Sequence, residues 1–184
     1  MIAKTKEEVA NLREGGRRLA RHVRILSEMV APGVTTLELE EKARAMVKAE
    51  GDNLAFLGHT ERQRDPPYPA GLCVSINDVI VHSPAGENGE VIRDGDVVCL
   101  DFGIKHKGLY TDHAVTVIAG TARDPHDEEL VRGTHEAIVA GIKEARVGNT
   151  TGDIGYAVEH IAHKYNFGFP RNLSGHGVGL KVHE

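Results

Sequence analysis

Two stretches of the chain, 115 residues apart, carry the same short pattern, and this internal repeat restricts the fold more than any other feature. Residues 32–36 read Pro-Gly-Val-Thr-Thr, and residues 147–151 read Val-Gly-Asn-Thr-Thr. Apolar residues coincide at the same offset, in the pairs Val23 with Ile138, Leu39 with Ile154, Ala43 with Val158 and Met46 with Ile161. We therefore predict a duplicated unit in which two helices are followed by strands.

The spacing of apolar residues and the capping residues predict four helices. Thr5 and Glu8 have the spacing of a capping box at the start of the first helix. Asp124 and Pro125 supply an N-cap and a first-turn proline for the third. The predicted helices run from Thr5 to Pro32, from Thr35 to near Gly51, from Asp124 to about Arg146, and from Thr151 to Tyr165.

Short β-type segments lie between the two helix pairs, so the expected fold class is α+β. The predicted strands cover residues 73–77, 79–82, 97–105 and 110–119, with turns at residues 86–89 and 93–95. The repeat places the second copy of the last hairpin near positions 212–234, beyond Glu184. We therefore expect one domain, 1–184, with a first half at 1–120 and a partial second half at 121–184. Such a truncated chain is expected to fold poorly and to bind metal weakly.

Composition and charge exclude several classes of function. The net charge is −5 and no basic stripe is present, so we expect no DNA binding. No stretch approaches the ~18 apolar residues of a membrane span, and no secretory signal precedes the first helix. Cys73 and Cys99 do not form a C-x-x-C pair, which favours a reducing, cytoplasmic setting.

Asp101 and Asp112 lie symmetrically about position 106.5, in a predicted turn at residues 106–108. In an unbulged hairpin this symmetry places them opposite each other, with Cβ atoms ~5 Å apart. Two such carboxylates repel unless one holds a proton or a cation lies between them. The alternatives are two solvated aspartates, or a register shifted by a bulge at Gly108. Carboxylates alone do not select a metal, whereas an added imidazole would favour a transition metal.

Three histidines are candidates for the remaining chemistry. His176 lies among three glycines, which allow close backbone approach, and it could coordinate a metal. His183 could donate to a substrate oxygen, and His82 follows a buried-looking pair of strands. The alternatives are a glycine-rich turn with incidental histidines, and a structural His82. A serine hydrolase is disfavoured because no serine lies in a G-x-S-x-G elbow.

Taken together, these motifs resemble those of the type I methionine aminopeptidases, of the pita-bread fold and metallopeptidase family M24. Residues 73–78 with His82 resemble the family's C-x-S-x-N-[DE] block and its following histidine. Asp101 and Asp112 match its two aspartate ligands, and residues 175–184 resemble its G-H-G-[IV]-G-x-x-x-H-E block. The resemblance covers essentially all 184 residues in the correct order.

The resemblance implies a site with two divalent ions (Co, Mn, Fe or Zn) that lower the pKa of a shared water and orient the substrate's amino terminus. The implied metal ligands are Asp101, Asp112, which bridges, and His176. His82 would contact the substrate near its scissile amide, and His183 would help polarise the carbonyl. Tyr68 and Cys73 match positions that line the methionine pocket.

The implied activity is removal of the initiator methionine from nascent proteins, with the N-terminal Met of peptides and proteins as the partner. Proximity to the ribosome, a monomeric state, and no contact with DNA or membrane follow as expectations.

The chain departs from the family pattern at three places. The family completes its site with two glutamates after the histidine block, and Glu184 is neither of them. The loop at 58–71 is longer than expected, and Val182 stands where an aromatic pocket residue is common. The alternatives are a peptidase resembling the Xaa-Pro aminopeptidases, a non-catalytic binding module of the same fold, and an inactive fragment.

Overall fold

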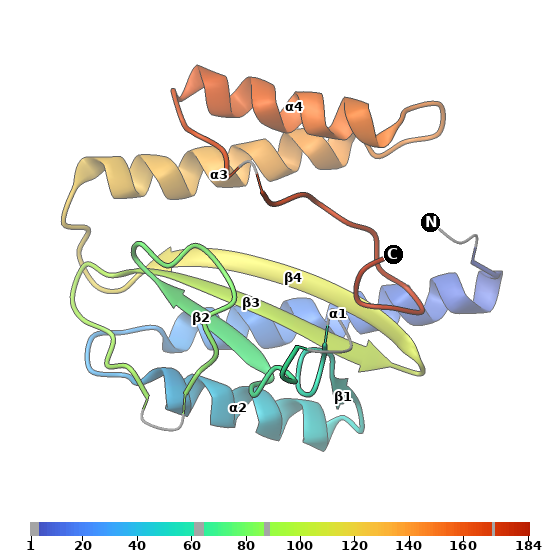
Figure 1. The fold of residues 1–184 in the computed structure, drawn as a ribbon, viewed down its shortest axis with the longest axis horizontal. Helices are drawn as coiled ribbons and strands as arrows, with labels where there is room; N and C mark the ends of the chain where they lie inside the picture. Colours follow the sequence, from blue (N-terminus) through green and yellow to red (C-terminus); the bar gives the residue numbers. More distant parts are fainter. Residues whose placement is uncertain (1–3, 61–64, 87–88, 171) are drawn as a thin grey trace. The chain divides into compact units, whose positions relative to one another are not determined.

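A computed structural model describes residues 4–60, 65–86, 89–170 and 172–184, which form two compact units. The first unit holds the described residues up to Thr121 together with Gly175–Glu184, and the second is Ala122–Ser174. Within these residues the elements are α1 (Lys6–Met29), α2 (Thr36–Ala49), β1 (Asn53–Leu54), β2 (Leu72–Ile76), β3 (Val97–His106), β4 (Leu109–Ile118), α3 (Pro125–Glu144) and α4 (Thr151–Lys164) (Figure 1). The predicted division at residue 120 concerns the origin of the two halves and stays a prediction.

β3 is the central strand of the sheet in the first unit. It pairs antiparallel with β4 on one side, and with β1 and β2 on the other. His106 pairs with Leu109 across a two-residue turn, in which Lys107 and Gly108 have φ of 46° and 86°. Two successive positive φ angles are typical of the type I′ turn, whose twist matches that of a tight hairpin.

This turn corrects the predicted register of the two aspartates. Asp101 pairs with Ala114, and Asp112 pairs with Gly103. The prediction that Asp101 and Asp112 lie directly opposite each other is therefore wrong by two positions, because the hairpin is centred between Lys107 and Gly108 rather than at position 106.5. Both aspartates still lie on one face of the hairpin, since side chains two residues apart on a strand point the same way.

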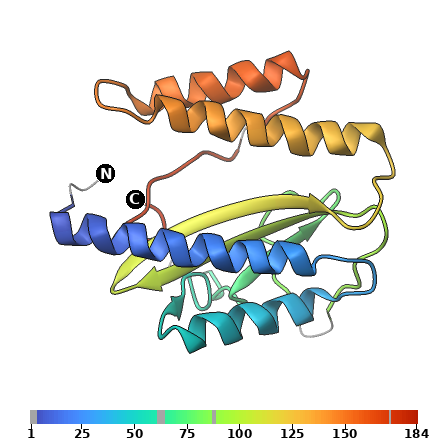
Figure 2. The ribbon, with the colours of Figure 1, turned by 180° about the vertical axis from the view of Figure 1, so that it is seen from behind.

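The two helices of the first unit cover the other face of the sheet (Figure 2). α1 packs against β3 and β4, and α2 packs against α1, β1 and β2. The even-numbered residues of β3 face the helices, and Phe102 is completely buried there. The helices contribute a row of fully buried residues to this core, namely Leu19, Val23, Leu26, Leu39, Ala43 and Val47. Each such side chain stabilises the fold by roughly 1.5–3 kcal/mol.

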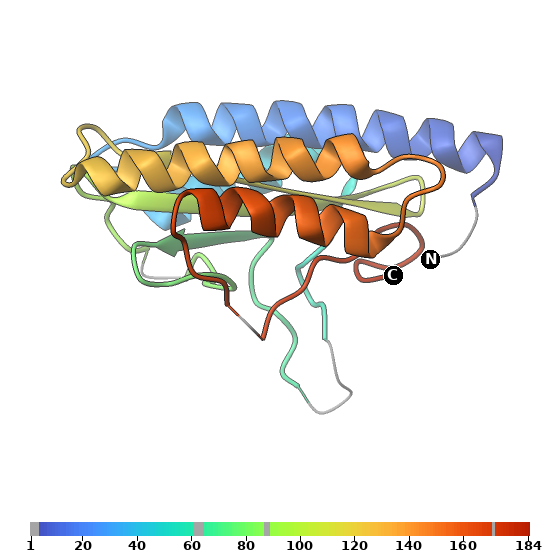
Figure 3. The same ribbon diagram turned by 90° about the horizontal axis from the view of Figure 1, so that it is seen from above.

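The helix boundaries confirm the four predicted helices and follow the repeat. α2 begins at Thr36 and α4 at Thr151, and both are 14 residues long. Thr35 and Thr150 precede them, and the backbone N–H of each donates to a carboxylate three residues on, at 2.7 Å in both cases. The same offset relates Gly33 and Gly148, whose φ angles are 94° and 98°. In the second unit, α3 and α4 lie side by side (Figure 3).

Two strand assignments differ from prediction. Residues 79–82 are irregular, with a bend at Val81, and do not form a strand. Ile80 is 62% exposed, so an apolar residue at this position does not indicate burial. The two-residue strand β1 was not predicted. The turn at 93–95 is confirmed, with Asp96 N–H donating to the Arg93 carbonyl at 3.1 Å. The predicted turn at 86–89 and the loop at 58–71 each lie partly outside the described residues. Within the part of the chain that is described, no helix combines the length and hydropathy needed to cross a membrane.

Candidate functional site

Two partly buried carboxyl groups on the β3–β4 hairpin form the centre of the candidate site. Asp101 and Asp112 face away from α1, and their side chains lie close enough for the charge of Asp112 to act on Asp101. Burial and the adjacent negative charge of Asp112 raise the pKa of Asp101 to about 7. Two carboxyl groups this close repel each other unless one of them holds a proton. At this position a divalent cation could take the place of that proton.

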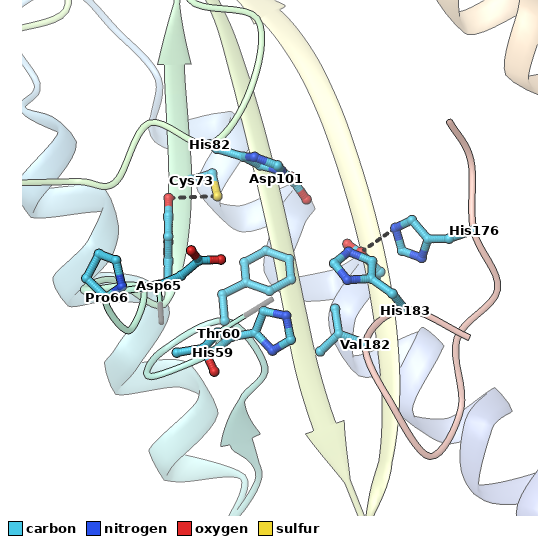
Figure 4. A pocket seen from close by; sticks show the side chains of 13 residues that line it. His59, Thr60, Asp65, Pro66, Cys73, His82, Asp101, His176, Val182 and His183 are labelled. Carbon is cyan, nitrogen blue, oxygen red and sulfur yellow. Dashed lines mark hydrogen bonds and ion pairs between the residues drawn. The ribbon is translucent and has the colours of Figure 1, made fainter. Parts of the chain in front are cut away.

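His176 reaches the pair from the Gly175–Glu184 segment. Its Nε2 lies 3.6 Å from Asp112 Oδ2, and its Nδ1 lies 3.0 Å from the Gly177 carbonyl oxygen (Figure 4). A carbonyl oxygen can only accept, so Nδ1 carries the proton in a neutral ring. Nε2 is then the nitrogen with the lone pair, and it is directed toward Asp112.

His183 lies against His176. Their ring centroids are 4.4 Å apart in an edge-to-face arrangement, and Figure 4 shows the two rings next to each other. His59 approaches His183 from the 58–71 loop, with ring centroids 5.6 Å apart. Three imidazoles from two distant parts of the sequence therefore lie in a row beside the carboxyl pair.

His82 has a left-handed backbone, with φ of 61°. This conformation is uncommon outside glycine and costs roughly 1–2 kcal/mol per residue. The neighbouring backbone holds it in place, because Val74 N–H donates to the Ser83 carbonyl at 2.9 Å and the backbones of Cys73 and Pro84 form an isolated antiparallel β-bridge. The strained conformation directs the His82 side chain into the same cavity as the carboxyl pair.

Tyr68 and Cys73 form an uncharged wall of this cavity. The Tyr68 hydroxyl donates to Cys73 Sγ at 2.9 Å. Burial raises the pKa of the Cys73 thiol to about 12 and raises the pKa of Tyr68 as well, so both side chains stay neutral.

The buried Glu40 carboxylate fixes the start of β2, since it accepts from the backbone N–H groups of Gly71 and Leu72 at 2.7 and 2.8 Å.

All seven predicted site residues line one cavity of about 280 Å³. They are Tyr68, Cys73, His82, Asp101, Asp112, His176 and His183. Val182, noted in the sequence as a pocket position, also lines it and is buried. The geometry brings these residues together, and their individual roles stay predictions.

Five further lining residues were not predicted, namely Phe56, His59, Thr60, Asp65 and Pro66. They come from the segment before β2, which folds over the cavity from the side opposite the histidine block. His59 is the most informative, because its Nε2 is buried and has no hydrogen-bond partner among the described residues. The sequence feature that could have indicated His59 was a histidine in the 58–71 loop, which is longer than expected.

The chemical types of the side chains at this site are suitable for binding a divalent metal. Two adjacent carboxylates and an imidazole with an available Nε2 are suitable ligands, and the imidazole favours a transition metal. Among the residues that the structure describes, no three such side chains are already arranged to hold an ion. Two ligands bound to one ion at about 2.0–2.2 Å lie roughly 3–3.5 Å apart. The His176–Asp112 separation of 3.6 Å is close to this range.

Comparison with known proteins identifies the family. The model of metallopeptidase family M24 matches residues 10–184. The chain belongs to this family. An M24 metallopeptidase is a hydrolase with a divalent metal cofactor, which agrees with the ligand chemistry of the Asp101, Asp112 and His176 cluster.

Relatives within family M24 are named methionine aminopeptidases. The protein of that name from Aquifex aeolicus is 41% identical over 181 residues, covering 98% of this chain and 69% of the relative. Methionine aminopeptidase 1 from Bacillus subtilis is 32% identical, covering 100% of this chain and 71% of the relative.

Solved structures place this M24 chain in the pita-bread fold. The crystal structure of methionine aminopeptidase from Thermotoga maritima matches with a TM-score of 0.92 at 32% identity, covering 100% of this chain and 71% of that one. The prolidase from Pyrococcus horikoshii matches with a TM-score of 0.83 at 22% identity, covering 100% of this chain and 49% of that one, and shares the fold alone.

Proposed function

We propose that the chain removes the N-terminal methionine from peptides and newly made proteins. One observation carries the proposal. A partly buried carboxyl pair, four histidines and an uncharged Tyr68–Cys73 wall line a single cavity. The names of the relatives agree with this reading, since the Aquifex aeolicus and Bacillus subtilis proteins, of which the chain covers 69% and 71%, are methionine aminopeptidases.

The metal would be held by Asp101, Asp112 and His176. Asp112 lies between the other two, because it contacts both the Asp101 carboxyl and His176 Nε2. This position suits it to share its carboxylate between two ions. When bound, a divalent ion supplies Lewis-acid polarisation of a carbonyl group and acidifies water. We propose two such ions, of a transition metal.

His183 and His82 would act on the peptide bond from different elements. His183 packs on His176 and is proposed to donate a hydrogen bond to the substrate carbonyl oxygen. Donors placed at a developing oxyanion typically contribute 10²–10³-fold to kcat. His82, held by its left-handed backbone, is proposed to contact the substrate near the scissile amide.

The methionine side chain would lie against the Tyr68–Cys73 wall. Both groups are neutral, and Phe56 and Val182 add apolar surface to the same cavity. An unbranched thioether suits such a site because it is flexible, polarisable and favourable next to aromatic rings. Because Val182 is smaller than an aromatic residue, we expect some tolerance for side chains other than methionine.

Methionine release from a Met-Ala-Ser peptide by the purified chain, with added Co²⁺ or Mn²⁺, tests the proposal. We expect metal-dependent release that Asp112→Ala abolishes. An Ala-Ala-Ser peptide and an Ala-Pro-Ser peptide serve as specificity controls. Faster cleavage before proline would favour the Xaa-Pro peptidases, and metal binding without release from any peptide would favour a binding module. Ribosome proximity and a monomeric state stay predictions.

A further inference from the structure

The segment that carries His183 is a closed turn. Gly177 and Glu184 exchange two backbone hydrogen bonds, of 3.2 and 3.0 Å, and Gly179 N–H donates to the Lys181 carbonyl at 3.2 Å. We call residues 177–184 the His183 turn. His176 lies directly before it and His183 lies within it, so the position of the turn sets the position of both imidazoles.

A buried ion pair joins this turn to the other end of the sequence. Lys4 Nζ lies 3.1 and 2.8 Å from the two carboxylate oxygens of Glu184, and the two side chains are 10% and 5% exposed. The same carboxylate accepts a hydrogen bond of 2.7 Å from the Leu180 backbone N–H. Glu184 therefore connects three points: its own end of the turn, the middle of the turn, and Lys4.

The ion pair packs directly on the backbone of the turn at Gly179. A Cβ atom at this position would lie 2.5 Å from Lys4 Cε and 2.8 Å from Glu184 Oε1, so any other residue here would require the ends of these two side chains to move. The Gly179 carbonyl accepts from Tyr110 N–H at 2.7 Å, which attaches the turn to β4 two residues before Asp112. The turn is thus held from one side by β4 and from the other by Lys4.

We propose that Lys4 is a positioning residue that acts through Glu184 to hold His176 and His183 against the carboxyl pair. Lys4 does not line the cavity. It immediately precedes Thr5, the N-cap of α1, and α1 packs on β3 and β4, which carry the two aspartates. The same rigid framework therefore supports both the aspartates and the anchor of the histidines. The consequence for peptide release rests on the proposed function.

Loss of the ammonium group would remove one of the groups that hold the Glu184 carboxylate, a side chain that is only 5% exposed. With less compensation, a largely desolvated charge reorients toward water or draws water in. Movement of Glu184 would displace Leu180, whose N–H donates to its carboxylate, and His183, the preceding residue in the chain. Displacements of about 1 Å at groups that position a substrate cost on the order of 10²-fold in rate.

Histidine ring NMR of the metal-free chain tests this directly, because it needs neither metal nor turnover. The Cε1–H resonances of His176 and His183 are assigned from His176→Gln and His183→Gln. In Lys4→Met we expect both resonances to shift or broaden, while those of His22 and His106 stay in place. Lys4→Arg should restore the parent spectrum, and Lys6→Met, at the exposed start of α1, should leave it unchanged.

Kinetics extend the test to function. We expect Lys4→Met to lower kcat for Met-Ala-Ser by about 10- to 100-fold with KM within about twofold, which is the pattern of misplaced reacting groups. Lys4→Met combined with Glu184→Gln should be no worse than Lys4→Met alone. Absence of peptide release in the parent chain, with the NMR result as expected, would count against the proposed function and not against the role of Lys4.

Two results would overturn the role of Lys4. The first is a folded Lys4→Met chain whose His176 and His183 resonances match the parent. The second is a change in all histidine resonances alike, in Lys4→Met and in the milder Lys4→Gln, which would make Lys4 a residue of general stability.

Discussion

The two faces of the β3–β4 hairpin hold similar polar residues in opposite electrostatic conditions. On the helix side, His106 Nδ1 lies 2.7 Å from Asp52, whose other oxygen lies 3.2 Å from Arg18. Also on that side, His22 Nε2 lies 3.2 Å from Glu50, which pairs with Arg21. Each buried carboxylate there has both an imidazole and a guanidinium.

The cavity side lacks this compensation. Asp101 and Asp112 contact each other and His176, and within the described part of the chain neither has a lysine or arginine ion pair. The comparison separates two uses of the same residue types. Carboxylates neutralised by arginine complete a core, whereas a carboxyl pair without such partners is suited to a cation from solution.

Removal of a carboxylate on the cavity side should have the largest functional effect. Asp112→Ala is expected to lower metal-dependent methionine release by about 100-fold or more and to abolish Co²⁺ binding in calorimetric titration. The midpoint of urea unfolding without metal should stay the same or rise, because a like charge beside Asp101 is removed. Lower stability without loss of metal binding would show that Asp112 is a structural residue. The cavity face and the helix face of the hairpin would then not differ in the way described.

Removal of a carboxylate on the helix side should have the opposite profile. Asp52→Ala leaves His106 and Arg18 without their partner, and we expect the free energy of unfolding to fall by about 3 kcal/mol. Urea denaturation measures this value. Co²⁺ affinity of the folded fraction should match the parent, and a matched loss of affinity would show that the two faces are coupled.

Metal binding should stabilise the fold only through the cavity side. At a Co²⁺ concentration 100 times its Kd, the free energy of unfolding should rise by about 2.7 kcal/mol. Thermal unfolding with and without metal gives this shift, and a chelator should reverse it. An equal rise in the free energy of unfolding of the Asp112→Ala chain would indicate that the ion binds at another site.

The smallest expected effect concerns His59, whose buried Nε2 has no hydrogen-bond partner among the described residues. If a polar group of the substrate forms a hydrogen bond with His59 Nε2, His59→Phe should raise KM for Met-Ala-Ser by about tenfold. This factor corresponds to loss of a hydrogen bond of about 1.4 kcal/mol. His22→Phe is the matched control on the helix side, where KM should not change. An unaltered KM in His59→Phe would indicate that the substrate does not reach this ring.

Local features of the fold were predictable from the sequence, because capping residues act within one turn of helix. Thr5 with Glu8 and Asp124 with Pro125 each fixed a boundary correctly. The hairpin register was not predictable, since Lys107 gives little indication of a left-handed conformation. Val79, Ile80 and Val81 suggested a strand, yet β-propensity depends on the surface available for packing.

The site was predictable in its residues more than in its shape. The motif resemblance named seven residues that all line the cavity, while spacing alone left alternatives open for each histidine. His59 and Phe56 could not be found in this way, because their place in the cavity depends on a loop folding back over a strand. Their contribution is a property of tertiary packing, which no local pattern encodes.

The width of the cavity depends on a position that has no side chain. At Gly103, opposite Asp112 in the hairpin, a Cβ atom would lie 2.8 Å from both Ala55 Cβ and the Phe56 ring. The missing methyl group lets the segment before β2 approach the sheet. Gly103→Ala would therefore act as a spacer that moves Phe56 and His59 outward together. Substrate preference could then be adjusted from within the sheet, by a residue that never meets the substrate.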